Sequence, residues 1–123
     1  MQRQILKVKI HNAIVTDAVL NYSGSITLDP SLVKAAGLLE NERVEVLNLN
    51  TGARFDTFVI KGKRNTGKVC LNGPAARLGQ PGDKIHILSW ALVDDCEIAS
   101  FKTKFIIMNE KNAIARIKEV RQK

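Results

Sequence analysis

The chain lacks most of the patterns by which enzyme sites are recognised in sequences. Its 123 residues include two histidines and two cysteines, which show neither H-x-x-H nor C-x-x-C spacing, so we expect no metal site. Neither a G-x-G-x-x-G loop nor a Walker phosphate loop is present. We expect Cys70 and Cys96 to be free thiols in a reducing compartment.

Long apolar runs are also missing. No stretch of 18 or more apolar residues occurs, which argues against a membrane-spanning helix. Residues 1–9 alternate apolar and charged side chains, whereas a signal peptide would show an unbroken apolar run. We therefore expect a cytoplasmic protein with no membrane partner.

Aromatic residues make up only 5% of the chain, while the formal net charge is +7. A small basic domain can bind nucleic acid through its phosphates, or its field can gather small anionic substrates. The basic residues are not interleaved with aromatic ones, which disfavours binding of single-stranded nucleic acid. Part of the charge lies in residues 111–123, a basic run typical of a solvated face or a frayed end.

Most of the sequence predicts short strands. Apolar and polar residues alternate from Leu6 to His11, the period of a half-buried strand. Asp29 and Pro30 predict the start of a short helix that Gly37 ends. Further strands are expected at 24–28, 44–49, 54–60, 69–71, 85–92 and 105–108, separated by turns at 50–52, 72–74, 81–83 and 109–112. About seven strands in one domain, residues 1–123, predict a small closed barrel.

Six blocks of the sequence follow one another in a specific order and spacing. They are Lys9-Ile-His11, Thr16-Asp-Ala, Tyr22-Ser-Gly24-Ser25-Ile-Thr-Leu-Asp29, Ala35-Ala-Gly-Leu-Leu-Glu-Asn-Glu42, Asn50-Thr-Gly-Ala-Arg54-Phe-Asp-Thr57, and Asn72-Gly-Pro-Ala-Ala-Arg77 with Gly82-Asp83. Jointly they resemble the bacterial aspartate 1-decarboxylases, without gaps from the start to about residue 90 and more weakly beyond it.

The resemblance implies a fold and an activity. The fold is mainly β, a double-psi β-barrel with short helices, assembled as a homotetramer with active sites between neighbouring subunits. The activity is that of a carbon–carbon lyase of pantothenate biosynthesis, which decarboxylates L-aspartate to β-alanine. Its cofactor is a pyruvoyl group made from Ser25, whose carbonyl takes the substrate amine as a Schiff base and acts as an electron sink.

Self-cleavage at Gly24-Ser25 is chemically coherent, although the dipeptide alone would indicate an ordinary turn. A serine hydroxyl that follows glycine can attack the preceding carbonyl, because glycine permits a strained backbone and adds no bulk. The resulting ester eliminates to a dehydroalanine, which hydrolyses to the pyruvoyl group. The products are a β chain, residues 1–24, and an α chain, residues 25–123. In the resemblance Thr57 supports this processing, whereas a strand threonine is the plain interpretation.

The resemblance also implies the substrate contacts. Arg54 and Lys9 match carboxylate-binding positions, and an arginine fork suits a carboxylate. Lys9 and His11 share a face of their strand by parity and can point into one site. Taken singly, they would be interpreted as a solvated lysine and a structural histidine. Further positions that match the lining of the family's site are Thr57, Asn72, Gly73, Pro74 and Ala75.

Two positions depart from the family's pattern. Leu47 stands where tryptophan is frequent, which we expect to change packing only. Phe58 stands where the family usually has the tyrosine that reprotonates the decarboxylated intermediate. Phenylalanine cannot donate a proton, so Tyr22, the one tyrosine in the chain, or a water is the expected donor. Three hypotheses therefore stand: an efficient decarboxylase, a processed homologue with weak turnover, and a basic module that binds nucleic acid. Whether another protein accelerates cleavage does not follow from the residues.

Overall fold

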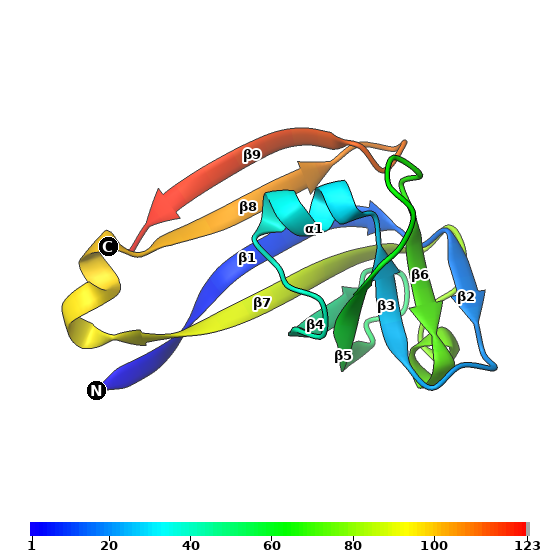
Figure 1. Cartoon of the computed structure of the whole chain (residues 1–123), viewed down its shortest axis with the longest axis horizontal. Helices are drawn as coiled ribbons and strands as arrows, with labels where there is room; N and C mark the ends of the chain where they lie inside the picture. The colour runs from blue at the N-terminus through cyan, green and yellow to red at the C-terminus, as the bar shows by residue number, and fades with distance from the viewer. Residues whose placement is uncertain (123) are drawn as a thin grey trace.

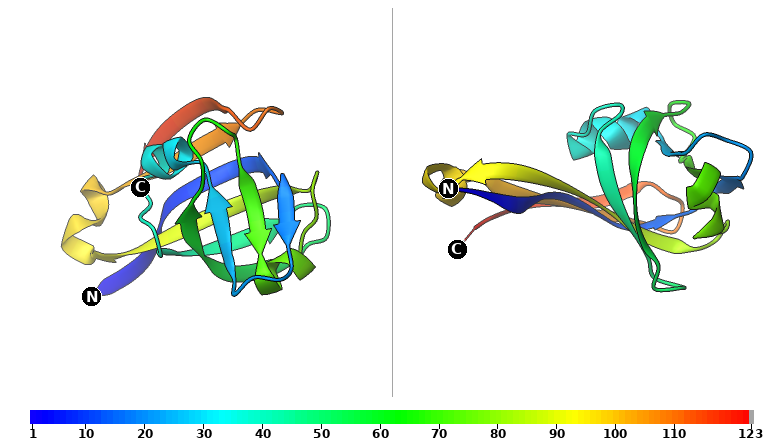
Figure 2. Two further views of the ribbon diagram at one scale, coloured as in Figure 1. Left: turned by 45° about the vertical axis from the view of Figure 1, so that its right-hand side comes forward. Right: turned by 90° about the horizontal axis from the view of Figure 1, so that it is seen from below.

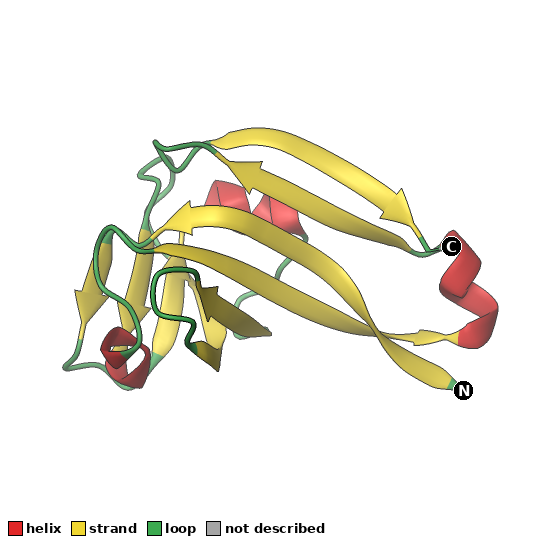
Figure 3. Cartoon of the chain, turned by 180° about the vertical axis from the view of Figure 1, so that it is seen from behind, coloured by secondary structure: helices red, strands yellow, loops and turns green. Residues whose placement is uncertain are grey.

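The computed structural model describes residues 1–122, and Lys123, the last residue of the basic tail, lies outside the described residues. Strands dominate it (Figure 3). They are β1 Gln2–Ile14, β2 Asp17–Val19, β3 Ser25–Leu28, β4 Arg43–Asn48, β5 Arg54–Lys61, β6 Val69–Asn72, β7 Lys84–Asp94, β8 Lys102–Met108 and β9 Ile114–Arg121. The helices are α1 Pro30–Ala36 and two 3-10 turns, η1 Gly73–Arg77 and η2 Asp95–Ser100. The expected fold class, mainly β with short helices, is confirmed.

The strands form one sheet that closes into a barrel (Figures 1 and 2). Their order is β2-β6-β3-β5-β4-β7-β1-β8-β9, with parallel pairs β2–β6, β3–β5 and β1–β8. Just beyond β1, the Thr16 amide donates to the Val69 carbonyl at 2.8 Å, which links the end of β1 to β6 and closes the barrel. This mixed closure agrees with the expected double-psi β-barrel.

The core lies inside the barrel, where alternate residues of each strand meet. Apolar side chains with 1% exposure or less come from seven strands, from α1 and from the segment just after β1: Val8, Ile10, Ala13, Val15, Ile26, Leu28, Val33, Val44, Val46, Val59, Val69, Leu71, Ile85, Ile87 and Ile106. Burial of each such side chain stabilises the fold by about 1.5–3 kcal/mol. Because successive strand residues point to opposite faces, the residues between these core positions face away from it.

The helix α1 begins and ends where the sequence predicted. The carboxylate of Asp29 accepts a hydrogen bond from the Ser31 amide at 2.9 Å, and Pro30 occupies the first turn. Gly37 closes the C-terminus in a left-handed conformation, φ 67°. Lys104 Nζ on β8 donates to the Ala35 carbonyl at 2.8 Å, which ties α1 to that strand. Within the described residues, no helix is long and apolar enough to cross a membrane.

The outer halves of β1 and β7 leave the barrel and form an arm with η2, β8 and β9 (Figure 2). The expectation of a frayed basic tail is wrong, because residues 114–121 pair with β8 from Lys102 to Met108. The expectation of a solvated face is correct, since this strand is exposed except at Val120. Strands β2 and β9, which the sequence did not predict, bring the count in the described residues to nine.

Candidate active site

The Gly24-Ser25 peptide lies where the chain enters β3, and two glycines shape it. Gly24 has φ 132°, a conformation that other residues rarely adopt, so its backbone favours glycine. Gly73, at the start of η1, packs directly on this loop: a Cβ built on it would lie 2.5 Å from the Tyr22 carbonyl oxygen and 2.8 Å from the Gly24 nitrogen. Any side chain at Gly73 would therefore displace the loop that carries Tyr22 and Gly24.

Asn72 holds the hydroxyl of Ser25. Ser25 has 0% exposure, and it stands opposite Asn72 in the antiparallel β3–β6 pair. Asn72 Nδ2 donates to Ser25 Oγ at 2.8 Å and to Thr27 Oγ1 at 2.8 Å. The serine oxygen is thus held in one position by a buried amide, beside a glycine whose carbonyl is the nearest upstream electrophile.

Strand register brings Thr57 and Phe58 to the same place. β3 and β5 are parallel, with Ile26 opposite Val59. Extended from Ile26 toward the start of β3, this register sets Phe58 beside Ser25 and Thr57 beside Gly24. Thr57 stands opposite the core residue Val44, so its side chain points toward the barrel interior. The side chain of Phe58 points to the opposite face of β5. Phe58 is 37% exposed.

Arg54 is on the same face of β5 as Phe58, four residues earlier and thus about 13 Å along the strand. Its side chain is 63% exposed and lies 3.6 Å from Glu45 Oε2. An exposed ion pair of this kind contributes at most about 1 kcal/mol. Its guanidinium can therefore exchange Glu45 for another carboxylate at low cost.

Lys9 and His11 share one face of β1, as parity predicted, but β1 does not pair with β3, which carries Ser25. Four strand spacings separate β1 from β3 in the order β3-β5-β4-β7-β1, about 19 Å along the sheet. Lys7 pairs with Glu42 at 2.9 Å, whereas Lys9 forms no ion pair within residues 1–122. The predicted substrate residues therefore fall into two groups on different parts of the barrel.

A stacked histidine pair accompanies Lys9. The rings of His11 and His86 lie 4.1 Å apart with 17° between their planes. A bulge in β1 places Asn12 at φ 63°, and its amide donates to His86 Nδ1 at 3.2 Å. Burial, and then the charges of His11 and Lys9, lower the pKa of His86 to about 4. Burial and the charge of Lys9 also lower the pKa of His11. Both shifts favour the neutral form of the two imidazoles, which leaves Lys9 as the cation beside them.

Two of the remaining predicted positions, Tyr22 and Pro74, lie close to Gly24. Tyr22 is half-exposed, and Pro74 lies 3.6 Å from a Cβ built on Gly24. Ala75 packs in the hydrophobic core. The structure thus brings together the loop, Ser25, Asn72, Gly73 and Pro74.

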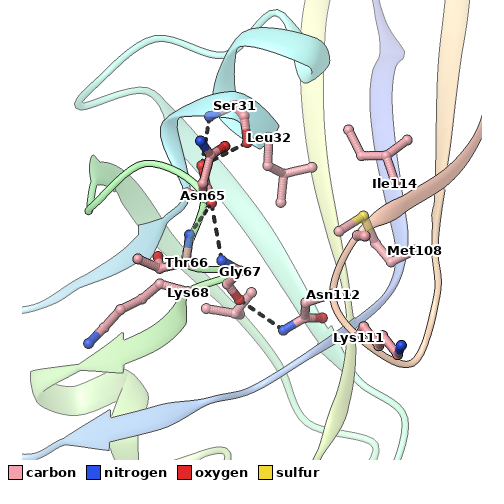
Figure 4. A pocket seen from close by; sticks show the side chains of 13 residues that line it. Ser31, Leu32, Asn65, Thr66, Gly67, Lys68, Met108, Lys111, Asn112 and Ile114 are labelled. Carbon is pink, nitrogen blue, oxygen red and sulfur yellow. Dashed lines mark hydrogen bonds between the residues drawn. The ribbon is translucent and has the colours of Figure 1, made fainter.

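A cavity of about 360 Å³ between α1, the 65–68 loop and the β8–β9 turn is a structural junction (Figure 4). Asp29 there accepts hydrogen bonds from the amides of Thr66 at 2.8 Å and Gly67 at 3.1 Å. Burial tends to raise the pKa of Asp29, but the hydrogen bonds it accepts lower it to about 2. Asn112 joins the β8–β9 turn to the Ile14 and Gly67 carbonyls. These polar groups form hydrogen bonds with one another, so their arrangement is explained without a bound ligand.

Sequence reasoning missed three residues of the site. Thr27 and Cys70 bond to Asn72, and His86 stacks on His11. Strand parity could have found the first two, because Thr27 lies two residues after Ser25 and Cys70 two residues before Asn72. His86 could not have been found, since its contact with β1 depends on which strands pair.

Comparisons with known proteins identify the family of the chain. The model of the family described as aspartate decarboxylase matches residues 1–115. Proteins named aspartate 1-decarboxylase from Thermoanaerobacter pseudethanolicus, Clostridium beijerinckii and Bacillus subtilis are 56%, 52% and 48% identical to the chain. The matches cover 91%, 92% and 95% of this chain and 96%, 91% and 92% of those proteins. The expected enzyme class, a carbon–carbon lyase, is confirmed, and the chain belongs to the aspartate decarboxylase family.

Proposed function

We propose that the chain is the self-cleaving precursor of a pyruvoyl-dependent enzyme that decarboxylates L-aspartate to β-alanine. Family membership supports the decarboxylation, and one observation carries the processing. The hydroxyl of Ser25 is buried and held at 2.8 Å by Asn72, directly after a glycine at positive φ. Membership also favours an enzyme over the nucleic-acid-binding module as the explanation of the net charge of +7.

The processing proceeds in steps that balance. Ser25 Oγ attacks the Gly24 carbonyl, the peptide C–N bond breaks, and the nitrogen of residue 25 takes the hydroxyl proton, which leaves an ester. Removal of the Cα proton of residue 25 then breaks the Cβ–Oγ bond, so Oγ departs in the carboxylate of Gly24. The dehydroalanine that remains consumes one water and releases ammonia, which completes the pyruvoyl group. Thr57, set beside Gly24 by register, is the proposed donor to the developing oxyanion.

The surroundings of residue 25 fit such a group. Asn72 and Thr27 would face it with an amide and a hydroxyl, and Gly73 leaves the loop room to pack. The group supplies an electron sink for the loss of carbon dioxide. Arg54 would bind a substrate carboxylate, and Phe58 would wall the pocket beside Ser25 without donating a proton.

We further propose that Lys9 and His11 serve the site of a neighbouring copy. Within one chain they lie about 19 Å along the sheet from Ser25. Leu88, Trp90 and Leu92 alternate along β7 on the face that carries Lys9, and the last two are exposed. Contact between copies over this face would cover that apolar surface, as in the homotetramer that the resemblance implies.

The test is intact mass spectrometry of the purified chain after incubation. Self-cleavage should give residues 1–24 and residues 25–123, with a pyruvoyl group that blocks Edman degradation of the larger piece. Ser25→Ala should remain a single chain. A wild-type chain that stays uncleaved after prolonged warming contradicts the proposed processing.

A further inference from the structure

Cys70 is a buried thiol that the proposed chemistry does not use. It lies on β6 two residues before Asn72, on the same face, and stands opposite Thr27 in the β3–β6 pair. Its Sγ lies 3.2 Å from Asn72 Oδ1 and 3.9 Å from the Leu71 carbonyl, so the Asn72 amide oxygen is the better acceptor for the thiol proton.

The contact bears on which way the Asn72 amide faces. A primary amide presents two N–H donors at one end and an oxygen acceptor at the other. Here the oxygen faces Cys70, and the nitrogen faces Ser25 Oγ and Thr27 Oγ1. The opposite orientation would aim the N–H groups at sulfur, a weak acceptor. A thiol that donates therefore favours the orientation in which Asn72 donates to Ser25.

The thiol keeps its proton. Burial, and then the carboxylate of Asp17, raise the pKa of Cys70 above its ordinary value, while Lys68 opposes them. Lys68 Nζ and Asp17 Oδ2 form an ion pair at 3.3 Å. The S–H group therefore stays a donor throughout the neutral range.

Donation to Oγ matters in both steps of the proposed cleavage. The oxygen develops negative charge as it loses its proton to attack Gly24, and it leaves with the Gly24 carboxylate in the elimination. An N–H group aimed at it stabilises that charge, whereas an amide oxygen in its place would repel it.

We propose that Cys70 is a positioning residue for self-cleavage, which fixes the Asn72 amide with its nitrogen toward Ser25 by donating to its oxygen. The proposal rests on the proposed function, because it concerns the rate at which the Gly24-Ser25 bond is broken. It assigns the thiol no direct contact with the reacting atoms.

The experiment compares cleavage rates by intact mass spectrometry in freshly purified precursors. Cys70→Ala removes the donor and should slow cleavage about tenfold, the effect of losing one buried hydrogen bond. Cys70→Ser keeps an O–H donor and should cleave within about threefold of the wild type. Cys96→Ala changes the exposed cysteine and should leave the rate unchanged. Melting temperatures of all precursors, measured in the Ser25→Ala background, report folding separately from cleavage.

The outcomes distinguish a failure of the proposed role of Cys70 from a failure of the proposed function. A wild-type chain that fails to cleave contradicts the proposed function. Wild-type rates in Cys70→Ala overturn the role of Cys70 alone. Equal slowing in Cys70→Ser and Cys70→Ala, with unchanged melting temperatures, would show that the volume of the thiol matters rather than its proton, and would also overturn it.

Discussion

The surroundings of Ser25 and those of Lys9 differ in how complete they are within one chain. Around Ser25, hydrogen bonds from Asn72 and a close-packed Gly73 leave the serine with no exposed surface. Around Lys9, the surface is half-exposed, cationic and adjoined by apolar side chains. The contrast supports the two proposals that one chain holds the parts for its own cleavage and that Lys9 serves the site of a second copy.

The largest expected effect comes from separating the two groups on different chains. Lys9→Ala and Arg54→Ala should each cleave normally but lose aspartate turnover, since an unpaired buried carboxylate typically costs about 2–5 kcal/mol. Co-expressed, the two variants should regain about a quarter of wild-type activity, because random assembly gives that share of sites an intact residue from each chain.

The control for this complementation is a chain that carries both substitutions. Expressed alone, it should stay inactive. If co-expression restores nothing while both variants cleave and assemble, Lys9 and Arg54 serve one site in one chain. That result would remove the proposed division between the two regions.

Phe58 allows a sharper test within the Ser25 region. We expect Phe58→Tyr to place a phenol beside residue 25 and raise turnover by roughly tenfold. This is less than the roughly 10²–10⁴-fold that a positioned proton donor typically contributes, because Tyr22 or a water already donates. Inactivation during turnover should also slow, because a proton placed on the cofactor carbon instead of the substrate destroys the pyruvoyl group. Progress curves of β-alanine formation measure both effects.

Tyr22→Phe is the matched change in the opposite direction. It should impair turnover without blocking cleavage if the phenol of Tyr22 is the present donor. Unchanged progress curves in both variants would leave water as the donor and exclude a role for either phenol.

The sequence predicted local features better than assembled ones. The Asp29 cap, the Gly37 terminus and the turn at 50–52 depend on neighbouring residues, and the structure has each of them. Strand β9 was missed because its basic run resembles a solvated tail, and its order comes from pairing with β8. Local patterns cannot show such a pairing partner.

The candidate site shows the same division. The blocks around Ser25 and Asn72 predicted residues that do lie together, since β3 and β6 pair directly. The separation of Lys9 from Ser25 could not be predicted from spacing, because it depends on strand order around the barrel. Cys70 escaped notice because a lone buried cysteine is usually a packing residue.

Acid should lower the stability of the fold through His86, beside Lys9, before it acts through Asp29. The pKa of His86 is about 4 in the folded chain against 6.5 for the free side chain. Below pH 6.5 the unfolded state therefore takes up a proton that the folded state refuses, so stability falls between pH 6.5 and 4. The pKa of Asp29 is about 2 in the folded chain against 3.8 for the free side chain. The stability that its ionised form contributes is therefore lost only below about pH 4.

Urea unfolding of the uncleavable Ser25→Ala chain at pH 7, 5.5 and 4.5 measures this dependence, at one protein concentration because assembly also stabilises. His86→Gln should flatten the decline between pH 6.5 and 4. An equally steep decline in that variant would assign the acid sensitivity to other groups.

The smallest expected effect concerns β9, most of which lies beyond the 115 residues that the family model matches. Lys118 stands opposite Phe105, which stands opposite Lys9, and Arg116 is related in the same way to His11 through Ile107. Two cations thus share the face of Lys9 about 10 Å away, close to the screening length in 0.1 M salt.

Replacing both of these β9 cations by glutamine should raise the KM for aspartate about twofold at low salt and hardly at all in 0.5 M salt. Lys102 and Arg121 face each other on the opposite side of the same two strands, so the same exchange there is the charge-matched control. Equal effects of the two double variants would show that β9 acts through net charge alone, and the extra strand would then have no share in the face that carries Lys9.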